Sequence, residues 1–432
     1  MLDSVDALIA DKLKPHSPGL ALAIAKNGEI IHRKGYGLAN LEWDIPITPD
    51  TVFRLASITK QFTAVAIMLL QAQGKINLDD SLTRFLPDYP TSGHEVTIRQ
   101  LLNHTSGIKS YTDLPGFFEK ISTTAITPPA LVEHFRNLPF DFKPGAQWQY
   151  NNSAYHLLGL IIEKLSGVSY GEFIKQHIFE PLGMQHSYYL DNEPIIPRRA
   201  SGYVETPDGF LNAPFLNMQI PYAAGSLGST VDDLLIWNQA LFEGRLISAD
   251  ALATMHQPTI LNDGTPYPYG LGWSVIEYRG HRGVQHSGGI NGFNTQLMHL
   301  PADGLTIALL CNWNGFNTEQ TLFAIARRAL GIPEVTPTFV TLSAEQLDQF
   351  AGTYIDNRVG KCEIKRADDQ LELAVGNFKF TWRATGATSF IEDNDPDYPI
   401  EFSDFRDGHY HHYTLKGITF TRTGQRAEEL AT

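Results

Sequence analysis

The stretch SITKQFTAVAIMLL, residues 57–70, decides how the first part of this chain folds and where its chemistry lies. After its first residues the stretch is apolar on almost every side, which predicts a buried central helix near 58–72. Residues three positions apart share a helix face, so Ser57 and Lys60 are expected side by side. Burial lowers the pKa of a lysine, and an amine near neutrality can accept the proton of a serine hydroxyl. The stretch therefore predicts a nucleophile and its base at a helix start, where free N–H groups can stabilise an oxyanion.

The same spacing of serine and lysine occurs again at Ser106 and Lys109. Ser106 stands in the segment NHTSG, 103–107, which is explained as a helix end with its turn. The residues after this segment predict a loop. A loop does not hold the two side chains together, and a lone S-x-x-K is usually no more than the start of a surface helix. We therefore assign the candidate nucleophile to Ser57.

Length and charge limit the classes of protein to which this chain can belong. Its 432 residues exceed the roughly 250–300 that one hydrophobic core supports, so two domains are expected. The 47 acidic residues outnumber the 33 lysines and arginines, which argues against nucleic acid or an anionic membrane as a partner. No segment reaches the ~18 apolar residues of a membrane span.

The acidic start MLDSVD does not resemble a signal peptide. A cytoplasmic protein is expected if Met1 is native, and a periplasmic or secreted protein if a leader was removed. Cys311 and Cys362 fall in different candidate domains and form no disulfide or metal pattern, so both are expected to be buried.

In the first 330 residues, strands are expected near both ends, inside a first and a last helix, and further helices lie between them. This order predicts an α+β fold, in which an antiparallel sheet is flanked by helices and holds an inserted all-α lobe. The cleft between sheet and lobe is the expected active site. Strands are expected near 20–25, 29–32, 270–276, 294–298 and 305–310, and helices near 3–14, 58–72, 129–136, 154–166, 170–179, 232–242 and 318–330.

The last part of the chain has a different pattern. Residues 332–341, IPEVTPTFVT, are expected to link the domain 1–331 to a second domain, 342–432. About eight short alternating strands in the last ~90 residues predict a closed antiparallel barrel or a sandwich. The histidines of 409–412, HYHH, follow this strand pattern without a further Cys/His cluster, so no metal or cofactor is expected.

A second motif follows the serine–lysine pair. Tyr150 and Asn152 lie in WQYNN, on a loop before a helix that is expected to begin near Ser153. Near an ammonium group the pKa of Tyr150 would fall, and its phenol could carry a proton between nucleophile and leaving group. Asn152 could hold both Lys60 and a substrate carbonyl.

A third motif, HSGG, begins at His286. Small residues on a strand let a substrate backbone come close, and the N–H of Gly289 could join that of Ser57 in an oxyanion hole. Such a donor is worth ~3–4 kcal/mol in the transition state. The rival spacing His281-x-Gly283 is expected in a hairpin turn. A neutral histidine is a weaker anchor for a substrate carboxylate than a lysine cation.

In this order, the three motifs resemble those of the serine penicillin-recognising hydrolases, and most of all their class C β-lactamase-like branch. Supporting segments are F-x-P-G-x-x-W-x-Y at 142–150, PLGM at 181–184 and YGLGW at 269–273, so the resemblance covers roughly residues 1–330. The roles implied are nucleophile for Ser57, proton transfer for Lys60 and Tyr150, oxyanion binding for the N–H groups of Ser57 and Gly289, and substrate binding for Asn152, His286 and Gly288.

Two features separate this chain from β-lactamases of that branch. It has no K-[ST]-G motif, and a histidine in its place is similar to D-aminopeptidase-like and esterase-like relatives. The expected barrel is similar to the lipocalin-like domains appended to such peptidases. The resemblance implies a serine hydrolase that forms an acyl-enzyme with small amides, short peptides with D-residues, or esters. The alternatives are a carboxylesterase, a true β-lactamase or, from another class, a penicillin-binding sensor with little turnover. A small-molecule or short-peptide substrate is expected, and an oligomer could form through the C-terminal domain.

Overall fold

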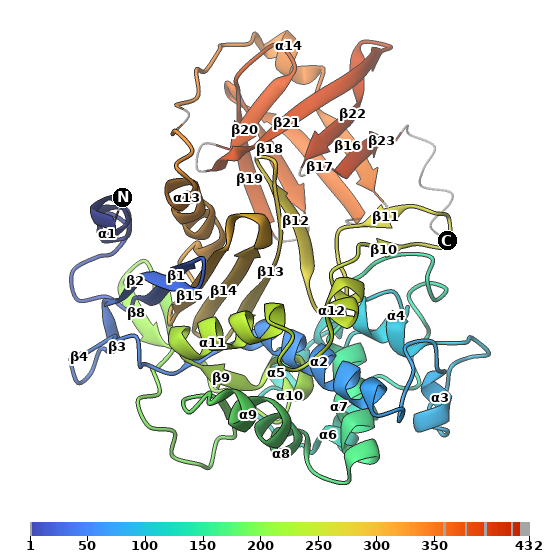
Figure 1. The fold of residues 1–432 in the computed structure, drawn as a ribbon. Coiled ribbons are helices and arrows are strands. Elements are labelled where there is room, and N and C mark those ends of the chain that lie inside the picture. Colours follow the sequence, from blue (N-terminus) through green and yellow to red (C-terminus); the bar gives the residue numbers. More distant parts are fainter. Residues whose placement is uncertain are drawn as a thin grey trace. The chain divides into compact units, whose positions relative to one another are not determined.

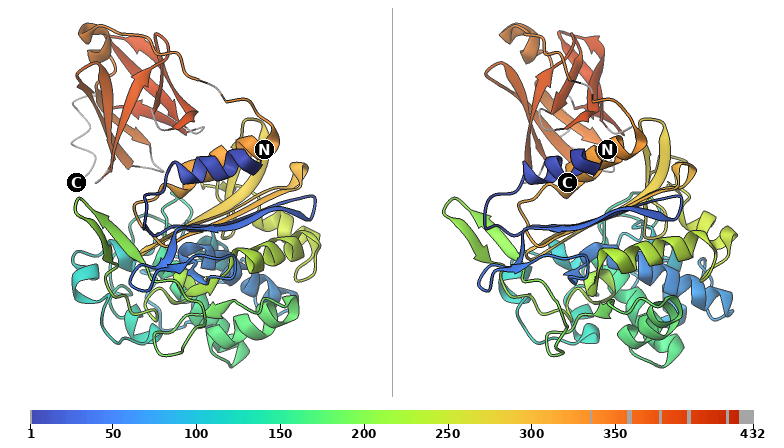
Figure 2. Two further views of the ribbon diagram at one scale, coloured as in Figure 1. Left: turned by 90° about the vertical axis from the view of Figure 1, so that its left-hand side faces the viewer. Right: turned by 60° about the vertical axis from the view of Figure 1, so that its left-hand side comes forward.

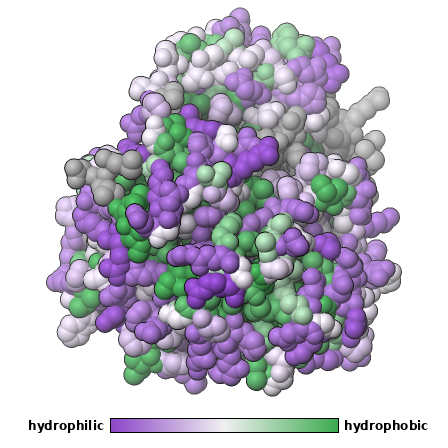
Figure 3. Space-filling view, in the orientation of Figure 1, coloured by the Kyte–Doolittle hydropathy of each residue, from purple (hydrophilic) through white to green (hydrophobic). Residues whose placement is uncertain are grey.

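The computed structural model describes residues 2–334, 336–356, 360–375, 378–392, 395–415 and 418–423. The chain forms two compact units, Met1–Gly331 and Ile332–Thr432 (Figure 1). Within the described ranges, no helix is long and apolar enough to cross a membrane. Cys311 and Cys362 are buried free cysteines, one in each unit. On the face shown in Figure 3, hydrophobic residues of the first unit lie in small patches among hydrophilic ones.

A six-stranded antiparallel sheet forms the centre of the first unit. In spatial order its strands are β12 (Ser274–Tyr278), β13 (His281–Ile290), β14 (Phe293–Leu300), β15 (Leu305–Cys311), β1 (Leu20–Lys26) and β2 (Glu29–Tyr36). β1 and β15 come from opposite ends of the unit and pair from Leu20 opposite Cys311 to Lys26 opposite Leu305. Their sequences, LALAIAK and LTIALLC, are mostly apolar because both faces of the sheet are covered.

Helices cover both faces of this sheet (Figure 2). On one face α1 (Leu2–Ala10) contacts α13 (Thr318–Leu330), which packs on β14 and β15. On the other face α11 (Val231–Phe242) packs on β1 and β15, and the helical lobe lies on this side. The expected α+β fold, a sheet flanked by helices with an inserted helical lobe, is confirmed.

Two long helices form the centre of the lobe, α2 (Thr59–Ala72) and α7 (Asn152–Ser166), and they pack against each other. The Asn151 side chain caps α7 by accepting the Ala154 N–H, and Gly167 ends the helix with a φ of 78°. Shorter helices of the unit are α3 (Leu82–Phe85), α4 (Ile98–Leu102), α5 (Phe117–Lys120), α6 (Pro128–Val132), α8 (Tyr170–Ile174), α9 (Glu180–Leu182), α10 (Tyr222–Gly225) and α12 (Ala249–Met255). Short strand pairs join β3 (Leu38–Asn40) to β4 (Ile45–Pro46), β7 (Tyr203–Thr206) to β8 (Gly209–Asn212), β10 (Thr259–Ile260) to β11 (Pro266–Tyr267), and β9 (Leu227–Ser229) to both β5 (Phe53–Arg54) and β6 (Tyr188–Tyr189).

Several element boundaries differ from those expected. The strand expected at 270–276 begins only at Ser274, because Gly272 adopts a φ of 81° where a Cβ would lie 2.9 Å from the Lys60 carbonyl oxygen. His281 was expected in a turn but begins β13, since the turn falls on the two residues before it. A π-helical segment at Lys175–Phe179 interrupts the helix expected at 170–179. The helices expected at 3–14 and 129–136 end at Ala10 and Val132.

The second unit contains a closed antiparallel barrel, as the alternating pattern predicted. Pairing of its first and last strands, with Tyr354 opposite Arg422, closes the barrel. Buried aromatic residues, among them Trp382, Phe402 and Tyr413, form its core. Helix α14 (Ala344–Asp348) precedes the strands, which are β16 (Gly352–Asp356), β17 (Gly360–Ala367), β18 (Gln370–Val375), β19 (Phe378–Ala384), β20 (Ser389–Glu392), β21 (Asp395–Arg406), β22 (His409–Leu415) and β23 (Ile418–Arg422).

Candidate active site

Ser57 lies in a single 3-10 turn, Ala56–Ile58, that leads directly into α2. Ala56 adopts a φ of 49°, a left-handed conformation that costs an L-residue about 1–2 kcal/mol and persists only where the surrounding structure holds it. The turn is held against β13, where Gly288 leaves room for it. A Cβ on Gly288 would lie 2.2 Å from the Leu55 carbonyl oxygen. The strained turn therefore fixes Ser57 at the junction of the lobe and the sheet.

Lys60 is completely buried beside Ser57, one turn further along the chain. Its Nζ lies 3.1 Å from Ser57 Oγ, 2.8 Å from Asn152 Oδ1 and 2.8 Å from the Ala224 carbonyl oxygen. Burial lowers the pKa of Lys60 well below its usual value. A neutral amine has two N–H donors and one lone pair. Because the amide and carbonyl oxygens can only accept, the lone pair is left for the Ser57 hydroxyl proton.

Tyr150 lies on the loop before α7, with its ring centroid 4.7 Å from Lys60 Nζ. Its hydroxyl is buried and has no geometric hydrogen-bond partner among the described residues. Burial raises the pKa of Tyr150, and the nearby Ser57 hydroxyl lowers it only in part. The expectation that Tyr150 has a lowered pKa is therefore wrong, because desolvation outweighs the lowering by the Ser57 hydroxyl. An unpaired buried hydroxyl costs about 1–3 kcal/mol, which a substrate atom or water at this position would relieve.

His286 lies on β13 and is buried, with both ring nitrogens engaged. Its Nδ1 is 2.6 Å from the Ser287 carbonyl oxygen and its Nε2 is 2.9 Å from the Tyr269 hydroxyl. The carbonyl can only accept, so Nδ1 carries the proton and Nε2 accepts from Tyr269. Burial, with a smaller contribution from Lys60, lowers the pKa of His286 to about 3. The ring is therefore neutral at physiological pH.

The hydrogen bonds continue beyond Tyr269 to a second buried histidine, His104. Its Nε2 lies 3.2 Å from the Tyr269 hydroxyl, and its Nδ1 accepts the Asn151 N–H at 3.1 Å. These hydrogen bonds form one chain, which we call the relay. In it Asn151 donates to His104, His104 donates to Tyr269, and Tyr269 donates to His286. The ring centroid of His104 is 4.5 Å from that of Tyr150. The relay therefore packs against the Tyr150 ring through His104.

Sequence reasoning missed the part that His104 and Tyr269 take in this site. His104 stands in NHTSG, which was explained as a helix end, and it does directly follow α4 and its cap residue Asn103. Tyr269 stands in YGLGW, a segment that supported the resemblance without a role of its own. A buried histidine in a polar turn was the available signal, but the partner 165 positions away could not be identified from spacing.

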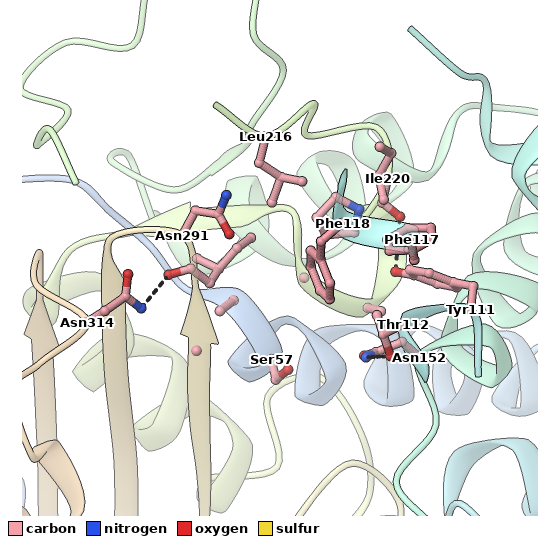
Figure 4. A pocket seen from close by; sticks show the side chains of 16 residues that line it. Ser57, Tyr111, Thr112, Phe117, Phe118, Asn152, Leu216, Ile220, Asn291 and Asn314 are labelled. Carbon is pink, nitrogen blue, oxygen red and sulfur yellow. Dashed lines mark hydrogen bonds between the residues drawn. The ribbon is translucent and has the colours of Figure 1, made fainter. Parts of the chain in front are cut away.

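A cavity of about 380 Å³ opens beside Ser57 (Figure 4). Ser57, Asn152 and Gly289 line it. Lys60 and Tyr150 are not among the lining residues. His286 and Gly288, which the sequence assigned to substrate binding, do not line the cavity either. The structure brings all the candidate site residues together around Ser57, but only three of them face the cavity.

Comparisons with known proteins identify the family to which the chain belongs. The family model described as Beta-lactamase matches residues 5–330. A penicillin-binding protein of Bacillus subtilis (strain 168) is 35% identical over 312 residues, covering 68% of each chain. The D-aminopeptidase of Gluconobacter oxydans (strain 621H) is 28% identical over 354 residues, which cover 79% of this chain and 64% of the relative.

Solved structures resemble the chain over one or both units. The octameric penicillin-binding protein homologue from Pyrococcus abyssi matches 97% of this chain and 99% of its own, with a TM-score of 0.70 and 28% identity. The D-amino acid amidase from Ochrobactrum anthropi SV3, complexed with D-phenylalanine, matches 76% of this chain and 98% of its own, with a TM-score of 0.67 and 25% identity. The chain belongs to the beta-lactamase family and is a serine hydrolase.

Proposed function

We propose that the chain hydrolyses small amides or esters through an acyl-enzyme formed on Ser57. The observation that carries this proposal is the set of three contacts around Lys60 Nζ, which leaves its lone pair for the Ser57 hydroxyl. Ser57 lines the cavity, so a carbonyl carbon bound there is within reach of Oγ. The D-aminopeptidase and the D-amino acid amidase among the similar proteins support an amide or peptide as one class of substrate.

In the proposed acylation, Ser57 Oγ attacks the substrate carbonyl while its proton passes to the Lys60 amine. The carbonyl oxygen becomes an oxyanion, which we assign to the N–H groups of Ser57 and Gly289. Tyr150, with its unpaired hydroxyl, transfers the proton onward to the departing amine or alkoxide. Water then attacks the acyl-enzyme by the reverse sequence and regenerates Ser57.

We propose that Asn152 contacts the substrate, since it lines the cavity and also accepts from Lys60. For His286 and Gly288 we propose positioning roles instead of direct substrate binding. Gly288 admits the strained Ser57 turn, and His286 holds the Tyr269 end of the relay behind Tyr150. These assignments follow from the cavity lining, which includes Asn152 but neither His286 nor Gly288.

The test is a stopped-flow experiment with p-nitrophenyl acetate. We expect a burst of one nitrophenol per protein chain, followed by steady turnover, because acylation and deacylation are separate steps. Mass spectrometry of a quenched sample should find one acetyl group on the peptide that contains Ser57. A stoichiometric burst without turnover would contradict hydrolysis and favour a penicillin-binding sensor, in line with the penicillin-binding protein among the relatives.

The cavity and all the candidate site residues lie in the unit Met1–Gly331. A chain that ends at Thr338 should therefore keep the burst amplitude of the full chain. We also propose that the second unit contributes to self-association, on the strength of the octameric homologue that matches both units. Light scattering on the full and shortened chains would then show a smaller assembly for the latter. A shortened chain that is folded by circular dichroism yet gives no burst would contradict this division of roles.

A further inference from the structure

The cavity beside Ser57 has one strongly apolar side. Tyr111, Phe117 and Phe118 lie together on one side of Ser57, with Ile220 next to them (Figure 4). Leu216 completes this group of lining residues. Phe118 is 52% exposed although it is a large apolar side chain. An exposed aromatic ring at the mouth of a cavity is a typical anchor for an apolar part of a ligand.

The asparagine side chains that line the cavity donate hydrogen bonds to other atoms of the protein. Asn291 and Asn314 lie on the other side of Ser57 and donate to the carbonyl oxygens of Pro214 and Ile290, at 3.0 and 3.1 Å. Asn152 donates to Thr112 Oγ1 at 3.2 Å. These amides can orient a neutral ligand, but they supply no net charge.

Among the residues that the structure describes, no ionised side chain lines the cavity. Of the 16 lining residues that the structure describes, none is Asp, Glu, Lys, Arg or His. Lys60 does not line the cavity and its three contacts are with protein atoms, and both His286 nitrogens are engaged. A carboxylate or ammonium group on the substrate would therefore lose water here without meeting an opposite charge, which is unfavourable.

From this lining we infer the substrate class of the site, an inference that rests on the proposed function. The site takes uncharged esters or amides whose acyl group carries an apolar, phenyl-sized side chain. It discriminates against substrates with an ionised group next to the scissile carbonyl. Free-amino aminoacyl compounds and carboxylate-bearing β-lactams are both disfavoured, each because its charge has no partner in the cavity.

Three matched substrates test this inference on the full chain. The p-nitrophenyl esters of 3-phenylpropanoate, D-phenylalanine and 2-carboxy-3-phenylpropanoate share one frame and one leaving group. They differ only in hydrogen, ammonium or carboxylate on the α-carbon. Each kcat/KM is divided by the ester's spontaneous hydrolysis rate, because the substituents also change intrinsic reactivity. We expect the neutral ester to exceed both charged ones by roughly 10- to 100-fold, the penalty of an unpaired polar group.

A variant that adds a charge to the cavity gives a second, independent readout. Asn291→Asp should raise the ratio of the D-phenylalanyl ester to the neutral ester, since it places a carboxylate in the lining. The matched control is Gln73→Glu, which adds the same charge at the exposed end of α2, roughly 24 Å along the helix from Ser57. The control should leave the ratio unchanged. An unchanged ratio in both variants would overturn the argument from charge.

The outcomes separate the two proposals. If all three esters give an acyl-enzyme but the D-phenylalanyl or the carboxylate ester is preferred, the inferred substrate class is wrong and the proposed hydrolysis stands. If none of the esters acylates Ser57, the proposed function itself fails. Nitrocefin, a β-lactam with a carboxylate, should be turned over more slowly than the neutral ester, and the reverse order would also overturn the inference.

Discussion

Replacing Ser57 by alanine should abolish covalent labelling by a fluorophosphonate and lower ester hydrolysis by about 10⁴-fold or more. The reason is direct, since the variant lacks the oxygen that attacks the carbonyl. The substitution should leave the fold intact, because alanine is tolerated in the 3-10 turn and the Ser57 side chain contributes only its hydrogen bond with Lys60 Nζ among the described residues. Gel fluorescence after labelling measures the first effect, and stopped-flow absorbance measures the second.

The second S-x-x-K motif supplies the control for this experiment. Ser106 is buried in a loop after α4, and Lys109 forms an ion pair with Asp141 at 2.5 Å instead of approaching Ser106. Ser106→Ala should therefore be labelled like the unaltered protein. Persistent stoichiometric labelling of Ser57→Ala, lost only when Ser106 is also replaced, would move the nucleophile to the second motif.

The sequence predicted the parts of the site that depend on local spacing. Ser57 and Lys60 meet because one helical turn separates them, and the apolar run after them could only be satisfied by a buried helix. The pairing of β1 with β15 was also foreseeable, since two apolar strands at opposite ends of a domain need partners. The alternating pattern of the C-terminal part predicted a barrel or a sandwich, and the pairing of its first and last strands makes it a barrel.

Features that depend on burial or on distant partners could not be predicted. The pKa of Tyr150 is raised because the ring is enclosed, and enclosure depends on residues such as His104 that are far away in sequence. The hydrogen bond between Tyr269 and His286 joins residues 17 positions apart, and Tyr269 lies just before the turn at Gly272, where a strand was expected. Similarly, the neutral lining of the cavity is assembled from separate loops and helices, and no single motif encodes it.

Lys60→Ala and Tyr150→Phe should each lower kcat by roughly 10²- to 10⁴-fold, while the double variant should lose little more than the worse single variant. The Lys60 amine and the Tyr150 hydroxyl are expected to act in the same proton transfer. Lys60 has a lowered pKa and faces the Ser57 hydroxyl, and Tyr150 has a raised pKa and an unpaired hydroxyl close by. Lys60 takes the proton from Ser57, and Tyr150 delivers it to the leaving group. Because the transfer needs both steps, removing either residue leaves the other without function.

Tyr155→Phe is the control for this double-mutant cycle. The ring centroid of Tyr155 is 5.4 Å from Lys60 Nζ and the side chain is fully buried, but its hydroxyl donates to the Leu102 carbonyl oxygen at 2.6 Å. Removing that hydroxyl should lower stability by about 1 kcal/mol with little change in kcat. Additive losses in the Lys60 and Tyr150 cycle would mean that the two groups act in separate steps. In that case Lys60 would activate Ser57 alone, and the unpaired Tyr150 hydroxyl would require another explanation, such as binding of the substrate.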